Sequence, residues 1–271
     1  MEDNKIYVFL SHSHRDYEKV RIIRDLLEKE GFRPLMFFLK CLEKKEYKEL
    51  TEILIKEEID SRQRFILCES ENAVKSDWVK FEIKHIKETN RPYEIVNLDW
   101  SNEKIEGAIR NFKKRSTVFL AYPNNLYKLA VAANNELKKL DFRTFIDIEQ
   151  ITYGDKYDAR IIKSLNEASS DGYVLVFLDE NLKESSYLYH EISIVLRLSY
   201  INSHIGEPTR NRIIPIWASN NLDLSSLFRS RPDIKLLLGG YHGIDICKKT
   251  IKEACEEIGN KLLEIDIKYF Q

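Results

Sequence analysis

The sequence lacks an excess of charge of either sign. Its 271 residues include 43 lysines and arginines against 44 aspartates and glutamates, so the formal net charge is -1. Broad electrostatic binding to nucleic acid or to an anionic membrane surface needs a strongly basic face. We therefore expect neither nucleic acid nor a membrane among the partners of this chain.

Long apolar runs and a secretory leader are also missing. No run approaches the roughly 20 apolar residues that a membrane-spanning helix needs. Residues 1–5 lead directly into a strand-like run, 6–10, without the basic and apolar regions of a signal peptide. The four cysteines show no CxxC spacing, which favours reduced structural thiols. Together these absences predict a cytoplasmic protein.

Glycine-rich phosphate-binding motifs are missing too. The chain has nine glycines, and they form neither a GxGxxG pattern nor a Walker A pattern. If a dinucleotide binds, we expect it to bind as a substrate and not as a redox cofactor. His12 and His14 lie two residues apart after a predicted strand, but no third ligand accompanies them, so we expect no metal.

The chain does contain a regular alternation of short apolar runs with amphipathic stretches. Strands separated by helices of ten or more residues predict right-handed βαβ units and a parallel sheet. The predicted strands of the first half are 6–10, 35–39, 65–68 and 93–98, and its helices are 17–30, 47–60, 77–87 and 105–114. The predicted strands of the second half are 117–120, 142–146, 173–178 and 212–217, and its helices are 127–140, 158–168, 186–200 and 248–265.

The two halves repeat each other. Residues 8–10 match 118–120 at an offset of 110, and Glu82 matches Glu191 at an offset of 109. Tandem domains of one fold explain this period. The fold class is therefore α/β, and we expect two flavodoxin-like domains, residues 1–114 and 115–271, each with a mostly parallel sheet of about five strands flanked by helices.

Two glutamates occupy matching places at the start of a predicted helix. Ser76 is a good N-cap, and Trp78 and Glu82 are four residues apart, so they share one helical face. The second half repeats this pattern with Tyr187 and Glu191. Both sites follow a buried strand, and the loops at the carboxyl ends of parallel strands form the ligand crevice of open α/β sheets.

A structural explanation competes with the functional one at these positions. An exposed glutamate in the first turns of a helix can simply interact with the helix dipole. Trp78 can be a packing residue rather than a ligand contact. Asp16, after the first strand, can cap the following helix or contact a substrate.

Each half resembles a Toll/interleukin-1 receptor (TIR) domain of bacterial type. Residues 8–16 resemble the strand A of that family followed by Ser-x-x-x-x-Asp, and residues 76–82 resemble its Ser-x-Trp-x-x-x-Glu box. In the second half, 145–157 resembles strand B with the BB loop, and 185–191 gives Ser-x-Tyr-x-x-x-Glu. Found in order and twice, these boxes predict a tandem TIR protein.

Neither half carries every box of the family. The first half has no Asp…Gly pattern in the BB-loop region, where residues 36–42 contain no glycine. The second half has Ala121 where the first has Ser11, and Leu126 where the first has Asp16.

The resemblance implies an NAD+-cleaving enzyme, a glycohydrolase or ADP-ribosyl cyclase of prokaryotic antiviral defence that is activated by TIR–TIR assembly. It implies Glu82 and Glu191 as catalytic residues and NAD+ as the substrate. Another defence protein is a further implied partner. The residues that we expect to bind the substrate are Ser11, His12, Phe38, Lys40, Trp78, Tyr122, Asp147 and Tyr187.

The chemistry of the bond is consistent with one carboxylate per site. Cleaving the nicotinamide–ribose bond builds oxocarbenium character, which a nearby carboxylate stabilises. Nicotinamide leaves as a neutral molecule, so no second acid is needed to protonate it. A non-enzymatic TIR signalling scaffold and a nucleoside deoxyribosyltransferase-like enzyme, which shares the flavodoxin-like sheet, are the alternative functions.

Overall fold

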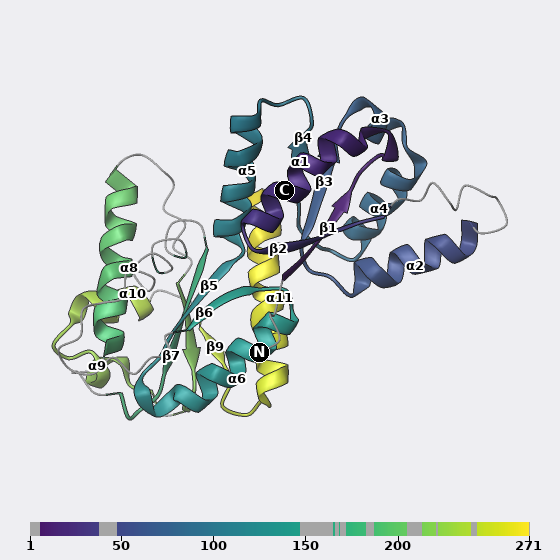
Figure 1. Ribbon diagram of the computed structural model, residues 1–271. Helices are drawn as coiled ribbons and strands as arrows, with labels where there is room; N and C mark the ends of the chain where they lie inside the picture. The colour runs from purple at the N-terminus through teal and green to yellow at the C-terminus, as the bar shows by residue number, and fades with distance from the viewer. Residues whose placement is uncertain are drawn as a thin grey trace. The chain divides into compact units, whose positions relative to one another are not determined.

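The computed structural model describes residues 6–37, 48–146, 165, 168, 172–182, 187–204, 213–220, 222–239 and 243–270. The chain divides into two compact units, Met1–Lys113 with Asn260–Gln271, and Lys114–Gly259 (Figure 1). Each unit has one sheet, and all strand pairings in both sheets are parallel. The predicted α/β class with parallel sheets is confirmed. Within the described residues, no helix has the length and apolar character to cross a membrane.

The first unit has a four-stranded sheet in the order β2-β1-β3-β4. Its elements alternate between strand and helix, as the periodicity predicts. They are β1 (Ile6–Ser11), η1 (His14–Asp16), α1 (Tyr17–Lys29), β2 (Phe32–Met36), α2 (Lys48–Asp60), β3 (Phe65–Glu69), α3 (Glu71–Lys75), α4 (Asp77–Glu88), β4 (Tyr93–Asn97) and α5 (Asn102–Arg115).

Helices cover both faces of this sheet because successive strand residues point to opposite sides. Val8 and Leu10 of β1 share a buried cluster with residues of α1 and α5. Phe9, between them, packs on the other face with residues of α2 and α4. Gly31, just after α1, has a φ of +89°, a conformation that favours glycine and suits the end of a helix.

The second unit has a five-stranded sheet in the order β6-β5-β7-β8-β9. Its first four strands repeat the order of the first unit. Its elements are β5 (Thr117–Ala121), η4 (Asn124–Leu126), α6 (Tyr127–Lys139), β6 (Arg143–Ile146), β7 (Tyr173–Leu178), α8 (Tyr187–His204), β8 (Ile213–Trp217), α9 (Leu224–Leu227), α10 (Pro232–Gly239), β9 (Ile244–Asp245) and α11 (Ile251–Phe270).

The two units differ in their chain path after the fourth strand. After β8 the chain passes through α9 and α10 and returns as β9 beside β8. After β4 it continues through α5 into the second unit, and among the described residues β4 has no further strand beside it. The sequence patterns predicted none of α3, α9, α10 and β9, because two to eight residues are too few to show a period. The predicted helix at 158–168 lies outside the described residues except for Leu165 and Ala168.

The end of α11 belongs to the first unit and supplies a buried ion pair there. Arg64 Nη1 lies 3.3 Å from Asp266 Oδ2, and the two side chains are only 5% and 6% exposed. Arg64 directly precedes β3, and its own carbonyl accepts a hydrogen bond from Phe9 N at 2.9 Å. A buried charge is strongly destabilising when its partner is removed.

Replacing Asp266 should therefore destabilise the first unit. We expect Asp266→Ala to lower the free energy of unfolding of that unit by about 3–5 kcal/mol, because the Arg64 guanidinium loses its buried counter-charge. Native-state hydrogen exchange of β1 and β3 measures this quantity. Glu264→Ala is the matched control, since its pair with Lys261 is exposed and should contribute little. A change within about 0.5 kcal/mol for Asp266→Ala would contradict the role of the pair.

Candidate functional site

The site of the first unit begins with the N-terminus of α4. Ser76 caps this helix, and its hydroxyl accepts a hydrogen bond from Val79 N at 3.4 Å, as predicted. The cap fixes where α4 begins, and one face of the helix turns toward the sheet. That face carries Val79, Glu82 and Ile86, all three of which are buried. Glu82 is only 4% exposed, so the explanation of an exposed carboxylate that only interacts with the helix dipole is wrong.

Glu82 meets the carboxyl end of β1. Ser11, the last residue of β1, donates a hydrogen bond from Oγ to Glu82 Oε2 at 2.5 Å. Burial raises the pKa of Glu82 to about 8, and the hydrogen bond from Ser11 opposes this shift only in part. The structure thus brings two predicted site residues together, and it holds the carboxyl largely protonated at neutral pH.

His12 follows Ser11 and is also buried. Its Nδ1 lies 2.9 Å from the Leu10 carbonyl oxygen, which only accepts, so Nδ1 is the donor. Burial lowers the pKa of His12, against the raising effects of that carbonyl and of Asp16. The imidazole is therefore favoured in its neutral form, with Nε2 as a hydrogen-bond acceptor.

Asp16 ties the start of α1 to the loop after β3. It accepts hydrogen bonds from Ser70 Oγ at 2.5 Å and from Asn72 Nδ2 at 2.7 Å. Asp16 stands at the N-cap position of α1, but its side chain makes no cap hydrogen bond. The predicted capping role is wrong, because donors more than fifty residues away take the carboxylate oxygens.

Two of the predicted aromatic residues, Trp78 and Tyr122, contact other aromatic rings. Trp78 is half-buried and lies edge-on to Phe81, with ring centroids 6.2 Å apart. Tyr122 follows β5, and its ring centroid lies 6.3 Å from that of Tyr127. The remaining predicted binding residues, Phe38, Lys40 and Asp147, lie outside the described residues, as does the side chain of Tyr187 at the start of α8.

The second unit keeps the glutamate, but an alanine stands where the first unit has Ser11. Glu191 is buried on α8, at the place of Glu82 on α4. Ala121 ends β5 where Ser11 ends β1, and its methyl group cannot donate a hydrogen bond. The two candidate sites are therefore chemically different.

The second unit has a hydrogen bond at the same place as the one from Ser70 to Asp16, but with donor and acceptor exchanged. Here the carboxylate is Asp179, directly after β7, and it accepts hydrogen bonds from Asn125 Nδ2 and from Asn181 N. The sequence comparison missed this pair because donor and acceptor have exchanged places.

The described cysteines Cys68, Cys247 and Cys255 are free thiols, as predicted. No group of three metal-ligating side chains occurs among the described residues.

Residues 8–113 match the model of the TIR domain family. The first unit is a TIR domain. The match ends at Lys113, and the second unit begins at the next residue, Lys114. The assignment of residues 115–271 to a second TIR domain, and the domain limits themselves, stay predictions.

A curated protein of Cytobacillus dafuensis, named "Putative cyclic ADP-D-ribose synthase TIR2", is 24% identical to this chain over 107 residues. The aligned part covers 36% of this chain and 27% of that relative. Among solved structures, the TIR domains of the activated Roq1 resistosome that recognises the pathogen effector XopQ are 15% identical. That alignment covers 54% of this chain and 98% of the other, with a TM-score of 0.39.

The buried carboxyl of Glu82 should give the stability of the first unit a characteristic pH dependence. Its folded pKa of about 8 lies above the ordinary value of 4.5. Folding therefore takes up a proton between these pH values, and stability falls as the pH rises through this window. The side chain in Glu82→Gln stays neutral at every pH. The free energy of unfolding of this variant, relative to that of the wild type, should therefore be more than about 1.4 kcal/mol higher at pH 9 than at pH 5.

Urea unfolding followed by circular dichroism at both pH values measures this difference. Glu71→Gln is the matched control, because Glu71 is 88% exposed and the substitution should give the same difference at both pH values. An equal pH dependence in Glu82→Gln and the wild type would show that Glu82 is not the titrating group.

Proposed function

We propose that the first unit cleaves the bond between nicotinamide and ribose in NAD+, as a glycohydrolase or an ADP-ribosyl cyclase, with Glu82 as the catalytic carboxylate. The observation that carries this proposal is a buried carboxyl group, hydrogen-bonded by Ser11, at the carboxyl end of β1 in a TIR domain. The distant similarity to a protein named as a cyclic ADP-ribose synthase supports it.

The environment of Glu82 suits a reaction that develops positive charge. In a site with little water, an ionised carboxylate stabilises an oxocarbenium-like ribose more strongly than it would in solvent. The raised pKa keeps this group protonated at rest. A bound nicotinamide ring is cationic, and a cation nearby lowers the pKa of a carboxyl group. Substrate binding would therefore ionise Glu82 where the charge is needed.

Ser11 and His12 have supporting roles in this proposal. The Ser11 hydroxyl orients Glu82 Oε2, and the neutral His12 stays a candidate for contact with the substrate. Ala121 cannot play the part of Ser11 beside Glu191, so we assign the main activity to the first unit and not to the second. Trp78 and Tyr187 stay candidates for contact with the nicotinamide ribose.

The alternative is a non-enzymatic TIR scaffold in prokaryotic immune signalling. The exposed apolar stripe of α2 favours it, because Leu50, Ile53 and Leu54 are each about half exposed on one helix. Self-association through TIR–TIR contacts is common to both proposals.

Replacing the proposed catalytic carboxylate tests the enzyme proposal directly. We expect Glu82→Gln to reduce nicotinamide release from NAD+ by about 10²-fold or more, because the developing charge loses its counter-ion. Mass-resolved products at several protein concentrations measure the rate and separate ADP-ribose from its cyclic isomers. Glu71→Gln should keep the wild-type rate, and Glu191→Gln should keep most of it. No nicotinamide release by the wild type at any concentration would favour the scaffold.

The pH dependence of the reaction gives a second test. If the ionised form of Glu82 is required, kcat/KM for NAD+ rises with pH through a midpoint near 8. Since the hydrogen bond from Ser11 lowers the pKa of Glu82, Ser11→Ala should move this midpoint to higher pH. Ser61→Ala, at an exposed position just after α2, is the matched control and should leave the midpoint in place. A midpoint that does not move in Ser11→Ala would contradict the assignment.

A further inference from the structure

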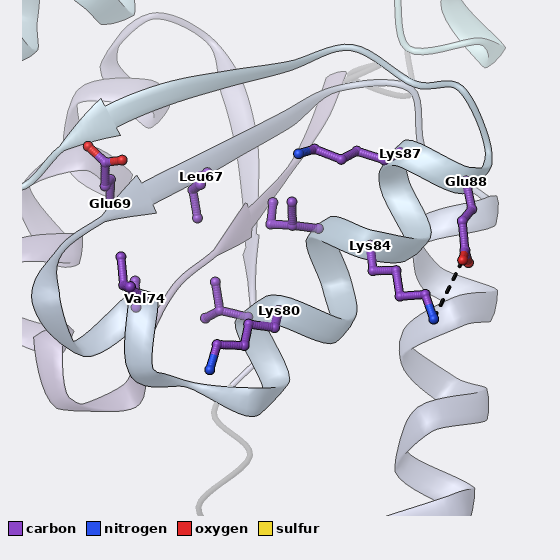
Figure 2. A pocket seen from close by; sticks show the side chains of 10 residues that line it. Leu67, Glu69, Val74, Lys80, Lys84, Lys87 and Glu88 are labelled. Carbon is purple, nitrogen blue, oxygen red and sulfur yellow. Dashed lines mark ion pairs between the residues drawn. The ribbon is translucent and has the colours of Figure 1, made fainter.

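A cavity of the first unit lies on the flank of α4 that does not carry Glu82. Its volume is about 540 Å³, and α3, α4 and the end of β3 line it. Figure 2 shows Leu67 on β3 and Val74 on α3 beside it, with Lys80, Lys84 and Lys87 along α4. The cavity therefore has an apolar interior and a row of lysines on one side, of which Lys80 pairs with Asp77 and Lys84 with Glu88.

The second unit fills the corresponding place with its own chain. Val79, Lys80, Ile83 and Lys84 line the cavity in the first unit. Residues 109 further along, on α8, are Leu188, Tyr189, Ile192 and Ser193.

These α8 residues contact the segment of α9 and α10. The Tyr189 ring lies 5.2 Å from the Phe228 ring, and its hydroxyl donates to the Leu227 carbonyl. Ser193 Oγ accepts from Arg231 Nη1 at 2.9 Å. Ile192 shares one buried cluster with Ile234 and Leu238 of α10. The second unit thus shows that an apolar helix covers this flank.

The first unit has no such covering helix among its described residues. After β4 the chain enters α5, and α5 packs through Ile105 and Ile109 on the opposite face of the sheet. The flank of α4 is left with lysines in place of Tyr189 and Ser193, and Val74 beside it is 64% exposed.

A helix with matching properties is exposed on the same unit. Along α2, Leu50, Ile53 and Leu54 are 55%, 53% and 48% exposed, and the spacing i, i+3, i+4 places them in one stripe. The exposed Glu57 continues this stripe. The helix carries two lysines against five acidic residues, whereas the cavity lining carries three lysines against two glutamates.

We propose that α2 of a second copy of this chain docks in the cavity beside α4. Its stripe would fill the space that α10 fills in the second unit, and Glu57 would face the α4 lysines. This inference gives the proposed TIR–TIR self-association a surface, and it needs no catalytic step.

The two surfaces of one unit cannot meet each other. α2 already packs against the other flank of α4, where Lys56 Nζ lies 5.5 Å from the Phe81 ring and His85 Nε2 lies 2.9 Å from Asp60 Oδ1. Each copy therefore offers a stripe to one neighbour and a cavity to another. Such heterologous contacts build open chains or rings and not closed two-fold dimers.

Sedimentation velocity of the full chain across a range of concentrations tests the proposal. The wild type should grow beyond a dimer as its concentration rises, because each contact leaves one stripe and one cavity open. Ile53→Glu, which places a charge in the stripe, and Val74→Arg, which places a cation in the cavity, should each raise the concentration for half-assembly at least tenfold. Ile22→Glu, the same substitution at a comparably exposed position of α1, should assemble like the wild type.

A mixture of the two variants, Ile53→Glu and Val74→Arg, gives the decisive test. Ile53→Glu keeps an intact cavity and Val74→Arg keeps an intact stripe, so a mixture should form one contact and stop at a 1:1 dimer. A wild type that stays monomeric, assembly that either variant leaves unchanged, or a mixture that does not associate would each overturn the proposal. Circular dichroism melting confirms that the variants are folded. Glu82→Gln should assemble normally, so loss of assembly and loss of NAD+ cleavage are distinguishable.

Discussion

The hydrogen bond from Ser11 to the buried carboxyl of Glu82 is the contact on which the candidate site depends. It joins the last residue of β1 to the first turns of α4, 71 residues further along the chain. Burial makes the charged form of Glu82 costly, and a single hydroxyl offsets this cost only in part, so the group titrates near pH 8. A ligand that brings positive charge would stabilise the ionised form of such a buried carboxyl group. The proposed NAD+ cleavage is a consequence of that electrostatic situation.

The two units show which parts of this arrangement can change while the sheet stays the same. Both bury a glutamate on the helix that follows the central strand. The first unit adds a hydroxyl from Ser11, and the second has the methyl group of Ala121. In the first unit Asp16 accepts from the loop after β3, whereas in the second Asp179 in that loop accepts from Asn125. Both units thus have a hydrogen bond between the start of the first helix and the loop after the third strand, with the carboxylate on opposite sides. The residue that ends the first strand differs between them. This contrast is why the proposals assign different roles to the two units.

The path of the chain after the fourth strand decides whether a helix covers the flank of α4 or of its counterpart α8. In the second unit it supplies α10 and β9, and the flank of α8 is covered. In the first unit it supplies α5 on the opposite face, and no helix among the described residues covers the flank of α4, which carries a row of lysines. An open apolar flank and an exposed apolar stripe on α2 are costly for a monomer in water. The apolar surface of both is removed from water if the α2 stripe of one copy docks in the cavity beside α4 of another copy.

The sequence by itself determined the alternation of strands and helices, the parallel sheets, the internal repeat and the cap of α4 at Ser76. These features depend on periods of two and 3.6 residues and on short-range hydrogen bonds, which the order of residues shows directly. The family resemblance of the first half was visible for the same reason, because its boxes are local. Only the tertiary structure decided that Glu82 is buried on Ser11, that Asp16 binds Ser70 and Asn72 and does not cap α1, and that one flank of α4 is open. The partners in these contacts lie 54 to 71 residues apart, and crossover connections, not sequence spacing, bring them together.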